Sequence, residues 1–154
     1  MPIEASDLMM KTLAQRGNAL VASPDLVAKT GAVCVPADLN NLASLDLGPP
    51  RQEHIWKLEG TDGAQANIHH RLRLVSDDMI SLRCAAIAGV GVVNLPLLMV
   101  SDEIRHGKLV HLLPSWAPKR QVVHAVYPTK RGLLPSVRAL LDYLGVRFSE
   151  LRED

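Results

Sequence analysis

The sequence predicts a protein of the α/β class, in which strands and helices alternate along the chain. Short apolar runs typical of buried strands alternate with stretches whose apolar residues recur at helical spacing. The chain has 154 residues, 47% of them hydrophobic, which is enough for one compact domain or for two small lobes. Aromatic residues are limited to two Trp, two Tyr and one Phe, so the predicted core is aliphatic.

The first third of the chain reads as a strand followed by a capped helix. Ala19–Ala22 is a short apolar run that predicts a strand. Ser23 is a favourable N-cap and Pro24 suits the first helical position. The helix over Asp25–Lys29 should end at Gly31. The patterns that follow predict a helical turn at Pro36–Leu39 and strands at Leu45–Leu47, His54–Leu58 and Ala66–Val75, the last two joined by the turn Gly60–Gly63.

A helix is expected after Ser76, because two acids, Asp77 and Asp78, stand where the first helical turn begins. In the stretch Arg71–Leu74 before it, basic and apolar residues alternate, which predicts one wet and one buried face. The helical residues with apolar spacing are Ile80, Cys84, Ile87 and Ala88. Beyond them the patterns predict a strand at Gly91–Asn94, a helix from Pro96 to Gly107, an extended stretch at Lys108–Leu113, a strand at Gln121–Tyr127 and a final amphipathic helix with the apolar face Leu134, Val137, Leu141, Leu144 and Phe148.

The closely spaced glycines Gly89 and Gly91 do not form a phosphate-binding loop. A dinucleotide fingerprint runs from strand through GxGxxG to helix, whereas here the helix precedes the glycines and a strand follows them. The end of a helix presents carbonyl groups, which repel phosphate. We therefore interpret Gly89 as the residue that ends a helix and Gly91 as a tight entry into a strand.

Charge and aromatic content disfavour a nucleic-acid-binding surface on this chain. The 17 Lys and Arg nearly balance the 16 Asp and Glu, for a net charge of +1. Proteins that grip DNA through its phosphates carry a clear basic excess. The few aromatic rings also argue against a platform for stacking single-stranded bases.

Motifs of catalysis, metal binding and membrane insertion are missing from the sequence. The six histidines form neither HExxH nor a His/Cys cluster, and the neighbours His69 and His70 should face opposite sides of a strand. No GxSxG is present. Cys34 and Cys84 form no CxxC, and we expect Cys84 to be a buried reduced thiol. The run 89–100 is too short to span a bilayer. We expect no enzymatic activity, no metal, no cofactor, no membrane association and a cytoplasmic location.

Six segments, in order, resemble the effector-binding domain of LysR-type transcriptional regulators. They are LVASPDL (20–26), PADLNNL (36–42), RLRLVSDD (71–78), AAIAGVGVVNLP (85–96), GKLVHLLPSW (107–116) and AVYPTKRGLLPSVRALLDYL (125–144). The resemblance covers nearly the whole chain. It implies a type II periplasmic-binding-protein-like fold, in which two α/β lobes joined by two crossing strands hold a small effector between them.

The resemblance also implies a domain organisation. Residues 1–18 would be a remnant of the first lobe, 19–121 the complete second lobe, and 122–154 a crossing strand and a C-terminal helix that returns to the first lobe. Ala19–Ala22 and Val122–Tyr127 would be the crossing strands. Most of the first lobe and the DNA-binding winged helix-turn-helix would then be absent, so that DNA contact would need a part this chain lacks.

The implied function is regulatory binding of a small-molecule effector, together with dimerisation. A terminal helix without the sheet it normally covers would expose an apolar face, which favours a homodimer. Two alternatives remain open. One is an interaction module that acts through dimerisation without binding a ligand. The other is a small cytosolic solute-binding or enzyme domain of similar α/β fold.

Candidate effector-binding residues lie at the ends of predicted strands, where ligands bind in open α/β sheets. They are Leu47, Gly48, Pro49, Ser76, Asp77, Met79 and Asn94. Ser76 and free amides at the helix start could bind a polar effector, although Ser76 could equally be a simple N-cap. The turn after Leu47 could line a cleft or be an ordinary turn, and Asn94 could satisfy local backbone groups instead. The two acids beside Ser76 disfavour an anionic effector.

Overall fold

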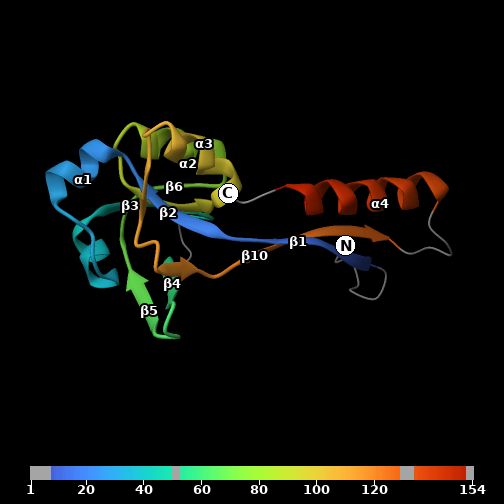
Figure 1. Ribbon diagram of the computed structural model, residues 1–154, viewed down its shortest axis with the longest axis horizontal. Coiled ribbons are helices and arrows are strands. Elements are labelled where there is room, and N and C mark those ends of the chain that lie inside the picture. Colours follow the sequence, from blue (N-terminus) through green and yellow to red (C-terminus); the bar gives the residue numbers. More distant parts are fainter. Residues whose placement is uncertain (1–7, 50–52, 129–133, 152–154) are drawn as a thin grey trace. The chain divides into compact units, whose positions relative to one another are not determined.

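The computed structural model describes residues 8–49, 53–128 and 134–151 (Figure 1). The chain divides into two compact units. Unit 1 comprises residues 1–16 and 121–154, and unit 2 comprises residues 17–120.

Unit 2 is built on a five-stranded sheet in the order β6-β3-β7-β2-β8. Its strands are β2 (Asn18–Ala22), β3 (Ala43–Leu47), β6 (Arg71–Ser76), β7 (Val92–Pro96) and β8 (Val110–Leu112). The strands β3, β6 and β7 run parallel to one another, and β2 runs antiparallel to both its neighbours. Parallel strands bring their carboxyl ends to the same edge of the sheet, which places the ends of β3 and β6 side by side.

Each face of this sheet is covered by a separate apolar cluster, as the alternation along β2 requires. Ala19 and Val21 pack with Leu82 of α2 (Met79–Ile87) and Val100 of α3 (Leu97–Arg105). Leu20 and Ala22 point the other way. They pack with the 3₁₀ helix η2 (Pro36–Asn41) and with a second sheet, through Leu39, Leu42, Trp56, Leu58 and Ile68. Burial of each large aliphatic side chain contributes about 1.5–3 kcal/mol, so β2 is the centre of unit 2's stability.

The second sheet of unit 2 has three strands in the order β5-β4-β9. They are β4 (Ile55–Gly60), β5 (Gln65–His69) and β9 (Trp116–Pro118), and all neighbours are antiparallel. The expected turn between β4 and β5 is present, with a hydrogen bond from Gly63 N to Gly60 O of 2.9 Å. The burial of β4 alternates strictly, which shows that one face of this sheet covers the core and the other is exposed.

Local signals in the sequence correctly predicted the ends of the first helix. In α1 (Pro24–Thr30) the Ser23 hydroxyl accepts a hydrogen bond from Leu26 N, and Gly31 closes the helix with a φ of 95°. The two later glycines also have the predicted roles. Gly89 adopts a φ of 78° just after α2, and a Cβ at Gly91 would lie 2.7 Å from the backbone oxygen of Ala43. Gly91 therefore allows β7 to approach β3 closely.

Two predictions about the segment 66–75 are wrong. The chain does not form one strand there, because it breaks at His70 and passes from the three-stranded sheet to the five-stranded sheet. The expected burial of one face of Arg71–Leu74 also fails, since Leu72 and Leu74 are 37% and 39% exposed. The reason is that β6 is the edge strand and lies at the margin of the layers that cover the sheet, so that neither apolar cluster includes Leu72 or Leu74.

The buried face of α2 also differs from the expected one. Leu82 and Ala86 are fully buried, whereas Ile80 is 57% exposed and the thiol-bearing Cys84 is exposed. The apolar residues of this helix extend around much of its circumference, so spacing alone did not identify which side faces the sheet.

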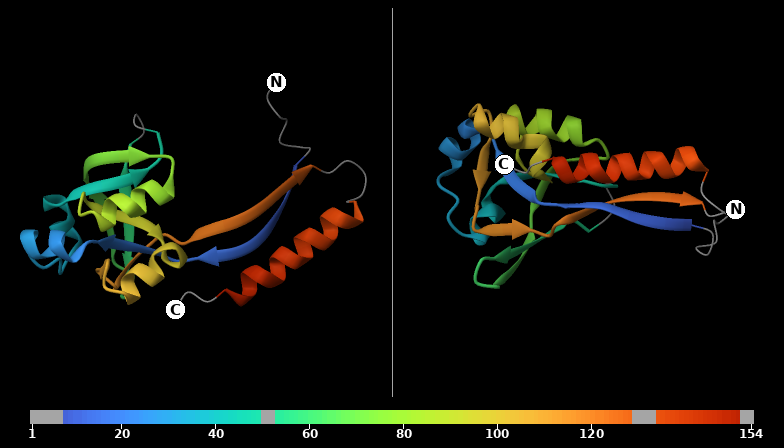
Figure 2. Two further views of the ribbon diagram at one scale, coloured as in Figure 1. Left: turned by 90° about the horizontal axis from the view of Figure 1, so that it is seen from above. Right: turned by 45° about the vertical axis from the view of Figure 1, so that its right-hand side comes forward.

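Unit 1 consists of the antiparallel pair β1 (Leu8–Arg16) and β10 (Gln121–Pro128) with the helix α4 (Pro135–Glu150) (Figure 2). Leu141 of α4 is buried, and the helix is tied to β1 by polar contacts. Lys11 Nζ lies 3.1 Å from Asp142 Oδ1, and Arg16 donates hydrogen bonds to the carbonyl oxygens of Phe148 and Leu151. Within unit 1, α4 therefore lies along β1.

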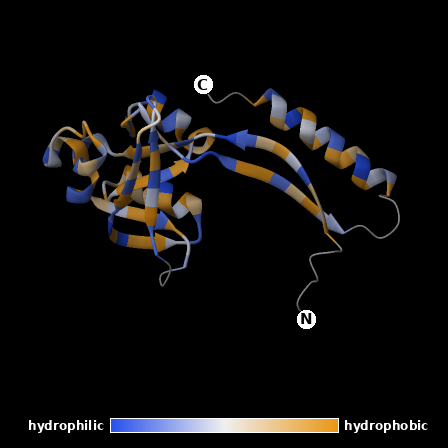
Figure 3. Ribbon diagram, turned by 90° about the horizontal axis from the view of Figure 1, so that it is seen from below, coloured by the Kyte–Doolittle hydropathy of each residue, from blue (hydrophilic) through white to orange (hydrophobic). Residues whose placement is uncertain are grey.

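The apolar face predicted for α4 is not left uncovered. Val137, Leu141, Leu144 and Phe148 are buried or partly buried, and only Leu134 of that set is exposed. A different set of apolar side chains on α4 is exposed. Figure 3 shows only that hydrophobic and hydrophilic residues alternate along this helix. The exposed set comprises Leu140, Tyr143 and Val146, and the strands add Leu8, Met9, Met10, Val122 and Val126.

The strands β1 and β9 were not predicted. The segment Ala19–Ala22, expected to be a crossing strand, lies within the five-stranded sheet of unit 2 between β7 and β8, and the strand that pairs with β10 is β1. In Leu8–Arg16, polar and apolar residues are mixed without strict alternation, so the pattern did not indicate a strand. The strand β9 has only three residues, which is too short a segment to show a strand pattern. Both strands are specified by pairing with distant segments.

Candidate functional site

A hollow of about 490 Å³ lies at the carboxyl ends of the parallel strands β3 and β6. The residues that line it are Gly48, Pro49, Val75, Ser76 and Asp77. Leu47 and Ser76 are paired in register, and Gly48 N donates a 3.1 Å hydrogen bond to Ser76 O. The two strand ends are therefore joined by the backbone, and the turn after β3 forms one wall of this Gly48–Ser76 hollow.

Asp78, and not Ser76, is the N-cap of α2. Its carboxylate accepts hydrogen bonds from Ile80 N and Ser81 N at 3.1 and 3.0 Å. The Ser81 hydroxyl and these two amides lower the pKa of Asp78. Ser76 Oγ instead accepts a 3.1 Å hydrogen bond from Asp78 N. The first amides of the helix, expected to be free for an effector, are therefore already bound by Asp78.

The structure brings together only part of the predicted site. Gly48, Pro49, Ser76 and Asp77 all line the hollow. Leu47 and Met79 pack against the apolar cluster between the sheet and the helices α2 and α3. Asn94 lies on β7 opposite Leu20, and its side-chain oxygen is buried without a hydrogen-bond partner among the described residues. None of these three appears in the lining of the hollow.

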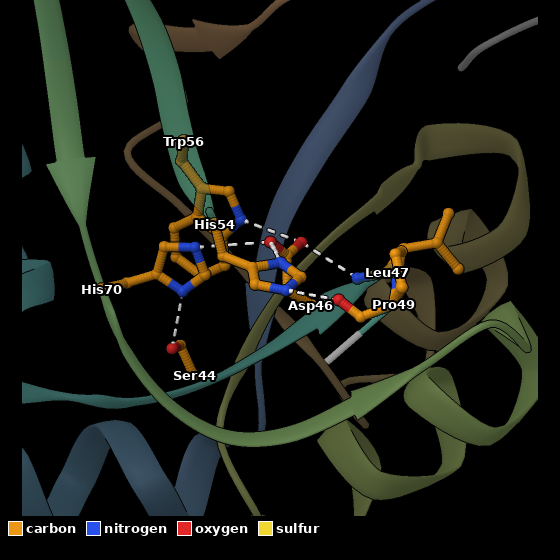
Figure 4. Close-up of polar contacts among 7 residues, drawn as sticks. All are labelled: Ser44, Asp46, Leu47, Pro49, His54, Trp56 and His70. Carbon is orange, nitrogen blue, oxygen red and sulfur yellow. Dashed lines mark hydrogen bonds and ion pairs between the residues drawn. The ribbon is translucent and has the colours of Figure 1, made fainter. Parts of the chain in front are cut away.

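A polar cluster that the sequence analysis did not predict lies next to the turn that follows β3 (Figure 4). Its centre is the carboxylate of Asp46 on β3, which is 16% exposed. Oδ2 lies 2.7 Å from His54 Nδ1 and 3.5 Å from His70 Nε2. Oδ1 accepts hydrogen bonds from Leu47 N at 3.0 Å and from Trp56 Nε1 at 3.4 Å. The carboxylate is thus surrounded by donors from three segments of unit 2.

Both histidines of this cluster are deeply buried, with side chains 5% exposed for His54 and fully covered for His70. His70 stacks on Trp56, with ring centroids 3.9 Å apart, and its Nδ1 lies 2.7 Å from Ser44 Oγ. His54 Nε2 lies 3.2 Å from the carbonyl oxygen of Pro49. That last contact links the cluster directly to the wall of the Gly48–Ser76 hollow.

The pKa of Asp46 reflects a competition between burial and hydrogen bonding. Burial by itself raises the pKa of the carboxyl, because it disfavours the charged form. Hydrogen bonds from His70, His54 and Leu47 N favour the carboxylate and outweigh burial, so that the pKa of Asp46 is lowered overall. The cluster therefore contains a buried anion at neutral pH.

One signal in the sequence could have suggested the Asp46 cluster. Asp46 interrupts an apolar strand, and a buried carboxylate needs donors to offset its lost hydration. The pairing itself was not predictable, because His54 and His70 reach Asp46 from two separate connections in the chain. Among the described residues, no group of three or more His, Cys, Asp or Glu side chains is arranged to hold a metal ion.

A second hollow, of about 630 Å³, lies on the exposed face of the β5-β4-β9 sheet. The apolar part of its lining includes Ala117 and Pro114, and charges of both signs surround it, including Lys57, Glu59 and Lys119. This mixture selects no single class of ligand. Within the part of the chain that the structure describes, no helix has the length and apolar character needed to cross a membrane.

The family model described as the LysR substrate binding domain matches residues 1–149. The chain belongs to this family. It is 30% identical to the HTH-type transcriptional regulator PtxR of Pseudomonas aeruginosa over 124 residues. This match covers 80% of this chain and 39% of PtxR. It is 26% identical over 149 residues to the HTH-type transcriptional activator AaeR of Escherichia coli K12, covering 97% and 48% of the two chains. The chain thus spans less than half of either relative.

Solved structures of LysR-type regulators share the fold of this LysR substrate binding domain. The regulatory domain of AphB from Vibrio vulnificus matches with a TM-score of 0.71 and 26% identity, over 92% of this chain and 70% of that domain. CrgA of Neisseria meningitidis, a LysR-type transcriptional regulator, matches with a TM-score of 0.80 and 23% identity, over 97% and 51% of the chains. The predicted α/β class and type II periplasmic-binding-protein-like fold are confirmed.

Proposed function

We propose that this chain is the effector-binding part of a LysR-type transcriptional regulator and that the Gly48–Ser76 hollow is part of its effector site. The observation that carries the proposal is the meeting of Gly48, Pro49, Ser76 and Asp77 at the carboxyl ends of two adjacent parallel strands. Open α/β sheets bind ligands at this kind of edge. Leu47 and Met79 would support the site from behind, and Asn94 would approach it from β7.

The proposed effector is a polar molecule that is neutral or positively charged. Asp77 lies in the wall of the hollow, and no basic side chain is among its described lining residues. The first amides of α2, which could have attracted an anion, are bound by Asp78. A carboxylate ligand would meet the Asp77 charge, and none of the described lining residues carries a compensating cation.

The proposed organisation assigns residues 19–121 to the second lobe of an effector domain. Residues 1–18 and 122–154 would belong to the first lobe and to the connection between lobes. Effector binding would shift the equilibrium between lobe arrangements, and a winged helix-turn-helix outside this chain would carry that shift to DNA. In this proposal the chain acts in the cytoplasm, without cofactor and without catalysis, as the naming of its relatives as transcriptional regulators supports.

The test is a thermal-shift screen with neutral, cationic and anionic small molecules, followed by calorimetry on any molecule that stabilises the protein. Ser76→Trp should fill the hollow and weaken binding about tenfold or more, a loss of about 1.4 kcal/mol. Ser136→Trp, on the exposed surface of α4, is the matched control and should bind normally. Unchanged affinity in Ser76→Trp would remove this hollow from the effector site.

We also propose that the chain forms a homodimer through the exposed apolar side chains of unit 1. Leu140, Tyr143 and Val146 are more than half exposed on α4, and contiguous apolar patches of this kind are uncommon on monomers. Light scattering over a concentration series should show a dimer for the wild type and a monomer for the double variant Leu140→Glu, Tyr143→Glu. A dimer without any stabilising ligand would favour an interaction module over an effector-binding protein.

A further inference from the structure

His54 lies between two groups that accept hydrogen bonds and have no proton to give. Its Nδ1 is 2.7 Å from Asp46 Oδ2 and its Nε2 is 3.2 Å from Pro49 O. A peptide carbonyl is only an acceptor, and so is an ionised carboxylate. The hydrogen bonds that the other oxygen of Asp46 accepts from Leu47 N and Trp56 Nε1 favour its ionised form. Both contacts of His54 are therefore satisfied only when both ring nitrogens carry a proton.

His70 needs one proton where His54 needs two. The Ser44 hydroxyl, 2.7 Å from His70 Nδ1, can donate as well as accept. A neutral His70 can therefore accept from Ser44 at Nδ1, while its Nε2, which makes no hydrogen bond among the described residues, faces Asp46 Oδ2 at 3.5 Å. The cluster then holds one anion, Asp46, and one cation, His54. A balanced, hydrogen-bonded pair is far less costly to bury than a single charge.

The cation is connected to the Gly48–Ser76 hollow through the backbone of the turn after β3. Leu47 N donates to Asp46 Oδ1, Gly48 N donates to Ser76 O, and Pro49 O accepts from His54. Three successive residues are thus held by three different partners. The contact with His54 is the one that reaches Pro49, which forms part of the wall of the hollow.

We propose that His54, as an imidazolium, is a positioning residue that holds the Gly48–Pro49 turn in the shape of the effector site, so that a rise in pH releases the turn. The proposal rests on the assignment of the hollow to the effector site. Loss of one ring proton to solvent leaves a lone pair on one nitrogen. The hydrogen bond to the Asp46 carboxylate is the stronger of the two, so Nε2 is the nitrogen that loses its proton and Pro49 O is the partner that is released.

The charged and titratable groups around His54 come from several elements of unit 2. Asp46 faces it directly from β3, and Asp77 shares the wall of the hollow with Pro49. His70, on the connection between β5 and β6, faces Asp46 and adds no charge when neutral. Glu53 precedes His54 in the chain and is exposed. From α2, which packs against β3, the charged side chain of Arg83 is directed to Glu103 and Met99 O.

The first test is nuclear magnetic resonance on the whole ¹⁵N-labelled chain between about pH 6 and pH 8, the range in which histidines act as switches. We expect both ring nitrogens of His54 to be protonated at the lower pH and His70 to carry a single proton. The backbone amide shifts of Gly48, Ser76 and Asp77 should move with the same midpoint as His54. A His54 ring with one proton throughout this range would overturn the proposal.

Variants separate positioning from a general effect on folding. His54→Arg keeps a cation with several donors, whereas His54→Gln removes the charge. His69→Gln, on the exposed face of β5, is the matched control. We expect the protection of Gly48 N, taken relative to the intrinsic exchange rate at each pH, to fall about tenfold or more in His54→Gln and to stay high and independent of pH in His54→Arg.

The control variant and the His54 variant are expected to behave differently. His69→Gln should keep the wild-type pH profile of the Gly48 and Asp77 amides, and loss of the profile in this variant would assign the switch to His69 instead. An unchanged profile in His54→Gln would refute the role of His54. None of these measurements uses a ligand, so their failure is distinguishable from a failure of Ser76→Trp to weaken effector binding.

Discussion

The strands of the two units differ in how completely they are buried. All five residues of β2 in unit 2 are buried, whereas the residues of β10 in unit 1 are exposed or half-buried along its whole length. The cause is the number of neighbours: β2 has a strand on each side and an apolar cluster on each face, while β10 pairs only with β1. A two-stranded ribbon is marginally stable by itself in water. Unit 2 should therefore carry most of the stability.

The largest predicted effect is that of Leu20→Ala in β2. Leu20 is completely buried, and truncation of such a side chain leaves a cavity that costs about 2–5 kcal/mol of unfolding free energy. Both tryptophans, Trp56 and Trp116, lie in unit 2, so urea unfolding followed by tryptophan fluorescence reports on this unit.

Leu141→Ala is the matched control for Leu20→Ala. Leu141 is buried on α4 in unit 1, and because both tryptophans lie in unit 2, its truncation should change the fluorescence-detected unfolding free energy by less than about 0.5 kcal/mol. Equal losses for the two substitutions would show that the stability of unit 2 depends on unit 1, and the contrast between the units would then be wrong.

Asp46→Asn should have an intermediate effect that depends on pH. Near neutral pH the substitution removes the anion that faces His54, and we expect a loss of about 1–3 kcal/mol from fluorescence-detected unfolding. The pKa of Asp46 is lowered in the folded protein by hydrogen bonds from His70, His54 and Leu47 N, which outweigh burial. Its contribution is therefore present above the unfolded pKa of about 3.9 and is lost as pH falls through the lower, folded value.

The difference between wild type and Asp46→Asn should consequently shrink as the pH is lowered below about 4. The unfolding free energy of Asp46→Asn should still depend on pH to some extent, because hydrogen bonds also lower the pKa values of Asp38 and Asp78. Asp142→Asn, an exposed residue of unit 1, is the control and should leave the slope in unit 2 unchanged. A pH-independent loss in Asp46→Asn would mean that packing, and not charge, connects Asp46 to its neighbours.

Features encoded in neighbouring residues were predicted best from the sequence. As expected, Ser23 caps the beginning of α1 and Gly31 its end, and Gly89 follows the end of α2. Such capping depends only on a few adjacent backbone groups. The meeting of Gly48 with Ser76 was also predictable, since the carboxyl ends of parallel strands share one edge of a sheet.

Features that depend on distant pairing were not predictable in the same way. The chain breaks at His70 because this residue leaves one sheet to reach Ser44 and Asp46 in the other. Leu72 is exposed because β6 is an edge strand, a fact of sheet order that alternation along β6 does not reveal. The Asp46 cluster combines both effects, since its members come from separate segments and none of them forms a sequence motif.

The last two predictions concern two glycines, one in each unit, and the smaller effect is that of Gly145→Ala. Gly91→Ala would place a Cβ 2.7 Å from the backbone oxygen of Ala43, so β7 would have to move away from β3 at a cost of about 1–3 kcal/mol, measured by tryptophan fluorescence.

Gly145 lies inside α4, and the nearest atom to a Cβ there is the flexible end of Lys11, at 3.9 Å. Gly145→Ala should therefore stabilise α4 by about 0.5–1 kcal/mol, because alanine loses less backbone freedom in a helix. Circular dichroism should show the gain in helix unfolding without a change in tryptophan fluorescence, and a parallel gain in fluorescence would mean that the two units unfold together.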